Sequence, residues 1–514
     1  MAQKKPLKQG QWKIKAMGNP YLTFLIGVAL LVMFAMSFPR LDDLTWGSSV
    51  GLDRLRSWFA GYNGRYVGNL IVIILTRLPA VFRALVELGV LCAALYCAHC
   101  VLPNKGTFCF FILALLILPL ELYAQGVVWT SGFANYATAA AVMLFELGTY
   151  QKIVIQNKTL SKGGYIVFFT VCFLGQMILE NLAIYSILLA GGAVAYSWFS
   201  GEKKACRPLL AAMILTVCAT AVVFLNSSYH SALAGDGGNY KEISLSLPEL
   251  WAKFETEVVP WLVQKNHLLN LALSVVLLLL WLTRDAKGKG LNQNCLGCFC
   301  GALLSAFFCY DVMDSSWLNT AAYGKTAYAL LALFYGAYII VTIVSNAPDR
   351  ASRLTLLTLA LSQIALAGPL VPARPLTARC FFLNGILWCL LLAALLQLLL
   401  ARRGLCFDKM AAQRSVARIT QVICIFYLVF VLCAQSQSWH IQALRMDAIR
   451  SGVQQGAQTI VLPEVPLSGI YCYGANVGND DYWQANYKRY YAIPEGVKVE
   501  FLNYATWCEQ YGRK

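Results

Sequence analysis

Long apolar runs separated by short polar connections recur along almost the whole chain. A helix needs about 20 apolar residues to cross the hydrocarbon core of a bilayer, and it satisfies its own backbone hydrogen bonds there. The pattern predicts about thirteen membrane-spanning helices, near residues 21–38, 80–102, 107–124, 132–150, 165–180, 182–199, 208–226, 266–283, 295–311, 326–345, 354–371, 380–400 and 416–434. The first run is not expected to be a cleaved signal peptide, because no small-residue cleavage site precedes LDDLTWG. We therefore expect an all-α polytopic membrane protein.

The composition supports this expectation. Hydrophobic residues make up 59% of the chain and charged residues 13%, with a mean hydropathy of +0.59, whereas soluble domains carry about 25% charged residues. This excludes a disordered chain and a soluble enzyme. Most of the 18 cysteines lie inside apolar runs, where they act as small hydrophobes rather than as a disulfide scaffold. The cluster CLGCFC (Cys295, Cys298, Cys300) begins such a run without a partnering His or Cys pair, so no zinc site is expected.

The positive charges predict the orientation of the helices. Lys and Arg are enriched in cytoplasmic loops, and here they gather in alternate connections, for example at residues 152–162, 203–207 and 402–418. This places the N-terminus inside and the C-terminus outside. The net charge of +16 then reflects topology and contact with anionic lipid, and no nucleic-acid partner is needed.

The predicted outer loops carry most of the chemically interesting side chains. Asp42 and Asp43 follow the first span, and Glu180 stands between two apolar runs. Two carboxylates at the bilayer surface can deprotonate a hydroxyl or hold a divalent cation, or they can simply solvate a helix exit. An ionisable group near membrane depth usually faces a cavity, although Glu180 could also snorkel at a helix end. We take all three as catalytic candidates, with a divalent cation possible and no certain cofactor.

The substrate-binding candidates come from the same loops: Arg65, Trp129, Asn135, Tyr136, His230 and Arg374. The arginines offer a planar fork of donors suited to phosphate oxygens, or they anchor lipid headgroups. The aromatic side chains can stack on a sugar ring or belong to the interfacial belt. His230 and Asp236 share a Gly-rich loop, but a lone His–Asp pair does not indicate a metal site.

The last 80 residues or so change in character and are predicted to form a small outer region of mixed α/β structure. A polar helix over about 438–456 precedes the strand-like TIVLP and a segment dense in tyrosine. Such rings must pack on something, and a region this short would be marginal alone. We therefore divide the chain into a membrane domain (1–434) and a C-terminal region (435–514) that docks onto the outer loops. A disulfide between Cys472 and Cys508 is left open.

The motifs LDD, GYNGR, WTSGFANY, LEN and PARP resemble those of the GT-C superfamily of membrane glycosyltransferases. They are similar above all to a bacterial family of glucosyltransferase-like multi-pass proteins without an assigned substrate, over roughly residues 1–434. The resemblance implies a bacterial cytoplasmic membrane protein that takes a sugar from a polyprenyl-phosphate donor to an envelope glycan or lipid, with inversion. It implies that Asp42 or Asp43 is the base and that Arg65 and Arg374 lie near the lipid phosphate.

Two other function classes stay open: a transporter or flippase of lipid-linked saccharides, with Glu180 as a proton or substrate site, and a non-catalytic envelope assembly protein. The polar residues gather on one side of the membrane, whereas transport sites tend to lie at the midplane. P-loop, GxSxG, HExxH and dinucleotide motifs are missing from suitable contexts. We therefore expect an enzyme that needs no nucleotide.

Overall fold

A computed structural model describes residues 19–234, 246–284, 291–313, 324–405, 410–478 and 480–511. The longer helices, in chain order, are α1 (Pro20–Ala35), α5 (Ala80–Val101), α6 (Lys105–Leu115), α9 (Thr138–Tyr150), α10 (Lys162–Leu174), α11 (Glu180–Phe199), α12 (Lys203–Phe224), α16 (His267–Leu282), α17 (Leu291–Met313), α19 (Gly324–Asn346), α20 (Arg350–Ala367), α21 (Phe382–Arg402) and α22 (Met410–Gln454). The shorter ones are α2 (Asp42–Gly47), α3 (Ser49–Arg56), α4 (Tyr66–Leu75), α7 (Leu120–Tyr123), α8 (Thr130–Gly132), α13 (Ser227–Leu233), α14 (Leu247–Lys253), α15 (Val259–Leu262), α23 (Asp481–Tyr490) and α24 (Tyr504–Tyr511).

The helices have the length and composition of a multi-pass membrane protein. Each of the thirteen predicted ranges contains helix. Within the described part of the chain, nine helices are long and apolar enough to cross a bilayer, and a tenth is added if the bent pair Lys105–Leu115 and Leu120–Val128 counts as one span. Helix α1, with 16 residues, is shorter than this limit. An all-α membrane fold is therefore confirmed, while the count of thirteen stays a prediction.

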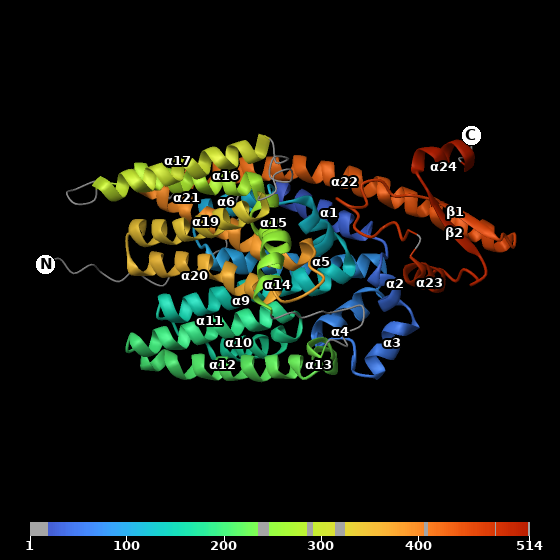
Figure 1. The fold of residues 1–514 in the computed structure, drawn as a ribbon, viewed down its shortest axis with the longest axis horizontal. Coiled ribbons are helices and arrows are strands. Elements are labelled where there is room, and N and C mark those ends of the chain that lie inside the picture. The colour runs from blue at the N-terminus through green and yellow to red at the C-terminus, as the bar shows by residue number, and fades with distance from the viewer. Residues whose placement is uncertain are drawn as a thin grey trace.

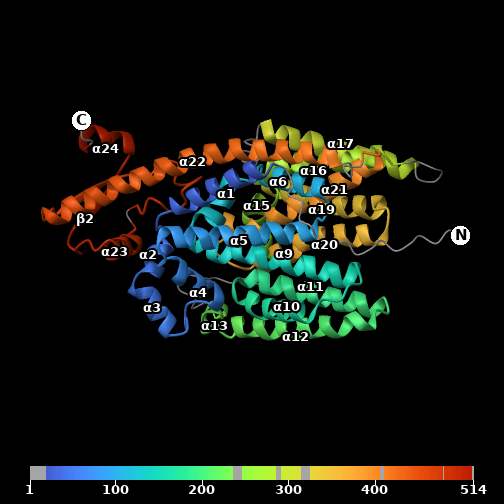
Figure 2. The same ribbon diagram turned by 180° about the vertical axis from the view of Figure 1, so that it is seen from behind.

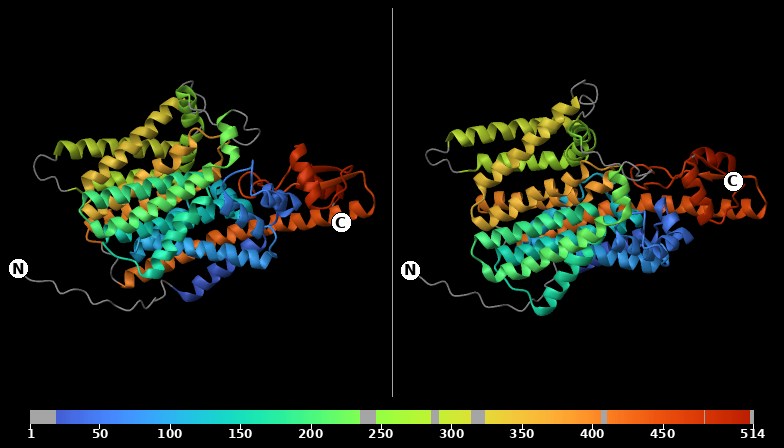
Figure 3. Two further views of the ribbon diagram at one scale, coloured as in Figure 1. Left: turned by 90° about the horizontal axis from the view of Figure 1, so that it is seen from below. Right: turned by 60° about the horizontal axis from the view of Figure 1, so that its bottom comes forward.

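The long helices run side by side along the longest axis of the molecule (Figure 1). Helix α21 is the most enclosed of the candidate spans in the described ranges, since 78% of the residues in its apolar stretch are buried inside the protein. It packs against α6, α16 and α20. Helices α1 and α5 lie on the face of the bundle that points away from the viewer in Figure 1, as the view from behind shows (Figure 2). Helix α22 packs against α1 and then continues well beyond the bundle (Figures 1 and 3).

A bend between α6 and α7 carries the chain into the bundle end where α2 lies. The two segments are inclined by 96°, and Pro119 stands at the N-cap of α7. Proline lacks an N–H and disfavours helix in the residue before it, so a helix usually ends there. Two π-helical segments follow, η1 (Ala124–Val128) and η2 (Phe133–Ala137). They place the WTSGFANY motif inside the protein, where nearly all of it is buried.

The C-terminal region is built on the projecting end of α22. Strands β1 (Thr459–Pro463) and β2 (Lys498–Leu502) pair in parallel, with Ile460 opposite Val499. The predicted TIVLP strand is confirmed, whereas the predicted polar helix proves to be continuous with the last span. The small core of the region includes Leu44 of α2, from the other end of the chain.

Candidate functional site

A cavity of about 520 Å³ lies where α2, α4, η2, the start of α11 and α23 meet. It also takes in the segment 369–380, which includes parts of η7 (Gly368–Leu370) and η8 (Ala378–Phe381). Seven of the nine residues predicted for the site line it: Asp42, Arg65, Trp129, Asn135, Tyr136, Glu180 and Arg374. The remaining two, Asp43 and His230, do not.

Asp42 is the carboxylate of the LDD motif that faces the cavity. It is half-buried on the first turn of α2. Burial raises the pKa of the Asp42 carboxyl above its ordinary value, and the guanidinium groups of Arg379, Arg54 and Arg65 oppose that shift. A carboxylate with a raised pKa is a better proton acceptor than an ordinary aspartate and suits a general base.

Asp43 is fully buried and bonded to the protein. Its Oδ1 accepts from the backbone N–H of Ser131 at 2.8 Å and from the Ser131 hydroxyl, and its Oδ2 accepts from the backbone N–H of Arg40 at 3.1 Å. Burial raises the pKa of Asp43 to about 6, against these hydrogen bonds and the charge of Arg40. Asp43 therefore connects α2 to α8, and the structure gives different surroundings to two carboxylates that look equivalent in the sequence.

Glu180 belongs to a bonded network in the cavity wall. The Arg65 Nε donates to Glu180 Oε2 at 2.7 Å, and the Tyr229 hydroxyl donates to Glu180 Oε1 at 2.5 Å. Tyr229 also accepts from the backbone N–H of Gly64 at 3.2 Å. Because both of its oxygens are engaged and its charge is balanced by Arg65, Glu180 is better placed to organise the wall than to act as a base.

The close approach of α4 to this wall depends on a glycine of the GYNGRYVGN segment. A Cβ at Gly68 would lie 2.5 Å from Asn135 Oδ1 and 2.9 Å from the carbonyl oxygen of Ile178. Any larger residue would push α4 away from η2. Asn135 is itself fixed, since its Nδ2 donates to the carbonyl of Ser131 at 2.8 Å.

Two arginines of the PARPLTAR segment line the cavity, and the sequence reasoning singled out only the first. Arg374 is exposed and lies 3.8 Å from Glu257. Arg379 is half-buried, with its guanidinium 4.9 Å from the Trp129 ring and 6.0 Å from the Tyr473 ring. No carboxylate lies within ion-pair distance of Arg379 among the described residues. Arg379 is thus the cavity arginine best able to bind an anionic ligand. Its position in a predicted outer loop, beside the PARP motif, was the sequence signal that could have identified it.

Aromatic side chains from distant parts of the chain complete the cavity. The Trp129 Nε1–H donates to the carbonyl of Arg40 at 3.1 Å, and its ring lies 5.7 Å from Tyr473. Tyr482 and Trp483 of the C-terminal region also line the cavity. The C-terminal region therefore forms part of the wall of this cavity.

The other sequence-based candidates lie elsewhere. His230 is exposed on α13 and does not line the cavity, so the structure does not bring it together with the other candidates. Asp236 lies outside the described residues. Across the described ranges, no three His, Cys, Asp or Glu side chains come together as a metal site. Cys472 and Cys508 are free thiols, and Cys472 donates to the Ser438 hydroxyl at 3.0 Å.

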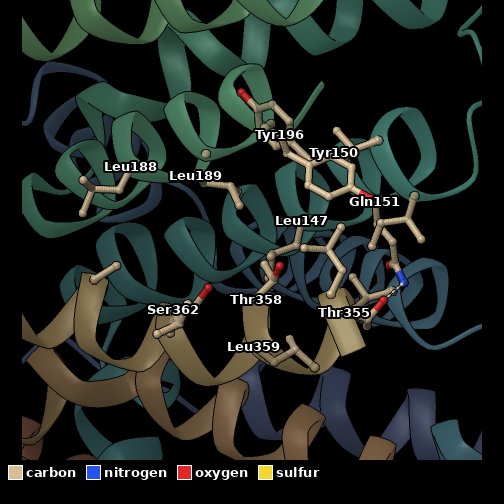
Figure 4. Close-up of a pocket in the computed structure, with 18 of the residues that line it drawn as sticks. Leu147, Tyr150, Gln151, Leu188, Leu189, Tyr196, Thr355, Thr358, Leu359 and Ser362 are labelled. Atoms are coloured by element: carbon tan, nitrogen blue, oxygen red, sulfur yellow. Dashed lines mark hydrogen bonds between the residues drawn. The ribbon is translucent and has the colours of Figure 1, made fainter. Parts of the chain in front are cut away.

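A second cavity of about 260 Å³ forms an apolar groove between α9, α11 and α20 (Figure 4). Leucines and tyrosines line it, and Gln151 donates to the Thr355 hydroxyl at one side, 3.4 Å away. Two of its lining residues, Leu188 and Leu361, are 54% and 48% exposed, which indicates that the groove opens at the surface of the helix bundle.

The groove and the cavity are separate, but neighbouring residues of the same two helices line them. On α11, Ile184 lines the cavity and Tyr185 lines the groove; on the α20 side, Pro369 lines the cavity and Ala365, one turn away, lines the groove. From Ile184 to Tyr196, the farthest groove residue on α11, the distance along the helix is roughly 18 Å at 1.5 Å per residue.

Comparisons with family models, with curated proteins and with solved structures found no match to this chain.

Proposed function

We propose that this protein is a membrane glycosyltransferase that moves a sugar from a polyprenyl-phosphate donor to a hydroxyl group of an envelope glycan or lipid. One observation carries the proposal: a single cavity brings together a half-buried carboxylate, Asp42, an arginine without an ion pair among the described residues, Arg379, and the aromatic rings Trp129 and Trp483. These are the groups that a hydroxyl, a phosphate and a sugar ring require.

The geometry supports Asp42 as the base and Arg379 as the phosphate-binding group. In the proposed reaction, the acceptor oxygen attacks the anomeric carbon and forms the new glycosidic bond while the bond from that carbon to the phosphate oxygen breaks. Asp42 takes the proton from the acceptor hydroxyl, and Arg379 stabilises the negative charge on the departing polyprenyl phosphate. A single displacement of this kind inverts the anomeric carbon. Arg65 and Glu180 hold the wall in place.

The apolar groove supports a donor with a hydrocarbon chain. It is lined by residues of α11 and α20 that neighbour those of the cavity, and two of its leucines are exposed at the surface of the helix bundle. In the proposed complex the hydrocarbon chain of the donor lies along α11 and α20, with its phosphate near Arg379.

We further propose the finer topology of the sequence expectation: thirteen spans in a bacterial cytoplasmic membrane, with the N-terminus inside, so that the cavity and the C-terminal region face outward. Reporter fusions near Lys158 and Arg403 should then report cytoplasmic, and one near Asn476 should report external. An external signal at Lys158 would contradict this orientation.

Cells that lack the protein, complemented with wild type, Asp42→Asn or Asp43→Asn, test the function. We expect mass analysis of surface glycans and lipids to show one sugar substituent lost in the null and in Asp42→Asn, with its polyprenyl-phosphate precursor accumulating. At matched protein abundance, Asp43→Asn should keep the substituent. Unchanged glycans and lipids in the null strain would refute the proposal.

The same strains separate the transferase from a flippase or an assembly protein. Neither alternative requires a base at Asp42, because the transporter alternative assigns its proton or substrate site to Glu180; either one therefore predicts that Asp42→Asn supports the wild-type glycan profile.

A further inference from the structure

We propose that the C-terminal region is a positioning device for Asp42, acting through the two leucines that flank the Asp42–Asp43 pair, Leu41 and Leu44. This inference rests on the proposed function, because it assigns Asp42 a reacting role. It goes beyond that function by making residues that do not touch the cavity, Gly474 and Arg445, determinants of the transfer rate.

The backbone of Leu41 needs support from its surroundings. Leu41 has φ 42° and ψ −116°, a conformation disfavoured for any residue with a Cβ, and such residues persist only where the surrounding structure holds them. Since Leu41 directly precedes Asp42, its torsion angles set the direction in which the Asp42 side chain leaves the chain.

Gly474 of the C-terminal region forms the support for the Leu41 side chain. A Cβ placed at Gly474 would lie 2.1 Å from Leu41 Cδ1 and 2.2 Å from its Cγ. These distances are far inside van der Waals contact, so only the bare backbone of a glycine allows Leu41 to lie there. Gly474 also has φ +69°, which a glycine adopts without strain.

The segment that carries Gly474 is fixed to α22 and cannot easily retreat. Arg445, which is 1% exposed, donates from Nε to the carbonyl of Pro463 at 2.7 Å, from Nη1 to the carbonyl of Ala475 at 2.7 Å and from Nη2 to Asn476 Oδ1 at 2.6 Å. Charge-assisted hydrogen bonds of this kind are strong. A steric conflict at Gly474 must therefore displace Leu41 rather than the segment.

The other side of Asp42 is held as well. Leu44, 1% exposed, is part of the small core of the C-terminal region together with Ile460, Leu462 and Val499. Tyr490 of α23 packs against Gly47 at the end of α2. The C-terminal region thus contacts the chain on both sides of Asp42, at Leu41 and at Leu44, while Asp43 accepts a hydrogen bond from Ser131. The conformation of the carboxylate depends on an element more than 400 residues away in the chain.

The experiment compares Gly474→Ala with Gly478→Ala in the full-length protein. Both glycines have positive φ, at +69° and +64°, but no atom of the described residues lies within 4 Å of a Cβ at Gly478. The two variants therefore share the backbone cost, and only the first drives a methyl group into Leu41. The variant Gly474→Ala with Leu41→Ala removes the conflicting atoms and provides a rescue.

Two readouts are measured in each variant at matched abundance: transfer of the sugar lost in the null strain, and hydrogen–deuterium exchange of the purified protein in peptides covering residues 37–47. We expect transfer to fall about 10²-fold in Gly474→Ala, the order of loss that a displacement near 1 Å can cause. Exchange around Asp42 should rise in the same variant. Gly478→Ala should match wild type in both readouts, and the double variant should recover transfer relative to Gly474→Ala.

Wild-type transfer in Gly474→Ala, or equal losses in Gly474→Ala and Gly478→Ala, would overturn the positioning role. So would unchanged exchange around Asp42. If the null strain loses no sugar, the proposed transferase fails, and a rise in exchange confined to Gly474→Ala would still establish that this region positions Asp42.

Discussion

Replacing Asp43 by asparagine should reveal a structural carboxylate whose ionisation opposes folding. Asp43 is 0% exposed, and burial raises its pKa from 3.8 to about 6. A carboxyl with a folded-state pKa above its unfolded value stabilises the protein while protonated, and that stability is lost as the pH rises through the folded pKa. Asparagine mimics the protonated form and does not titrate.

The size of the effect follows from the shift. A rise from 3.8 to about 6 corresponds to about 3 kcal/mol at 1.36 kcal/mol per unit. Between pH 4 and pH 7, the stability of Asp43→Asn relative to wild type should therefore increase by about this amount. At any one pH, the stability difference between the two proteins also contains the loss of the hydrogen bond from the Arg40 N–H. That contribution is the same from pH 4 to pH 7, so it does not affect the slope.

Unfolding of the two purified proteins in mixed micelles over this pH range measures the difference. Subtracting the wild-type curve removes the titrating groups that do not interact with Asp43, and carrying Glu87→Gln in both proteins removes a buried carboxyl that does. A stability difference that is flat with pH, or that declines as the pH rises, would refute the assignment of Asp43 as a buried carboxyl with a raised pKa.

Three further predictions concern the cavity. Arg379→Ala should reduce transfer about 10²–10³-fold, as expected for loss of one group that stabilises the leaving-group charge. Arg379→Lys, which keeps the charge but not the planar fork, should retain more activity. Equal transfer rates in the two variants would argue against phosphate binding by Arg379. Glu180→Gln should lower stability by about 2 kcal/mol because charge-assisted bonds from Arg65 and Tyr229 are weakened, visible as a lower melting temperature. Because the Asp42 pKa is raised, wild-type transfer should decline on acidification at a higher pH than an ordinary aspartate would give, and a rate that stays constant down to pH 4 would contradict this.

The apolar pattern predicted the helical membrane fold well because every span must meet the same requirement, about 20 apolar residues in a helix that satisfies its own backbone hydrogen bonds. It predicted the bends less well. Pro119 interrupts a run that reads as a single span from 107 to 124, and the structure turns by 96° there. Hydropathy reports burial in lipid or protein alike, so it cannot show where a helix turns back into the bundle.

The site shows the same division between local and distant information. Residue type and position in a predicted outer loop singled out Asp42, Arg65 and Glu180, which the structure brings to one cavity. They could not separate Asp42 from Asp43, because the separation is made by Ser131, which is 88 residues away. They also placed His230 in the site on the strength of its chemistry alone, whereas α13 leaves its side chain exposed. The insertion of Leu44 into the C-terminal core is equally invisible in a linear pattern.

The most direct test of the central claim is the rate of sugar transfer by purified, membrane-reconstituted Asp42→Asn and Asp43→Asn, measured with the polyprenyl-phosphate sugar that accumulates in the null strain and with envelope from that strain as the acceptor. Asp42→Asn should be slower than wild type by about 10²–10⁴-fold, the usual cost of losing a general base, while Asp43→Asn should stay within about tenfold of wild type, the rate change that corresponds to 1.36 kcal/mol. Wild-type turnover by Asp42→Asn would contradict the assignment of this carboxylate, and with it the proposed mechanism.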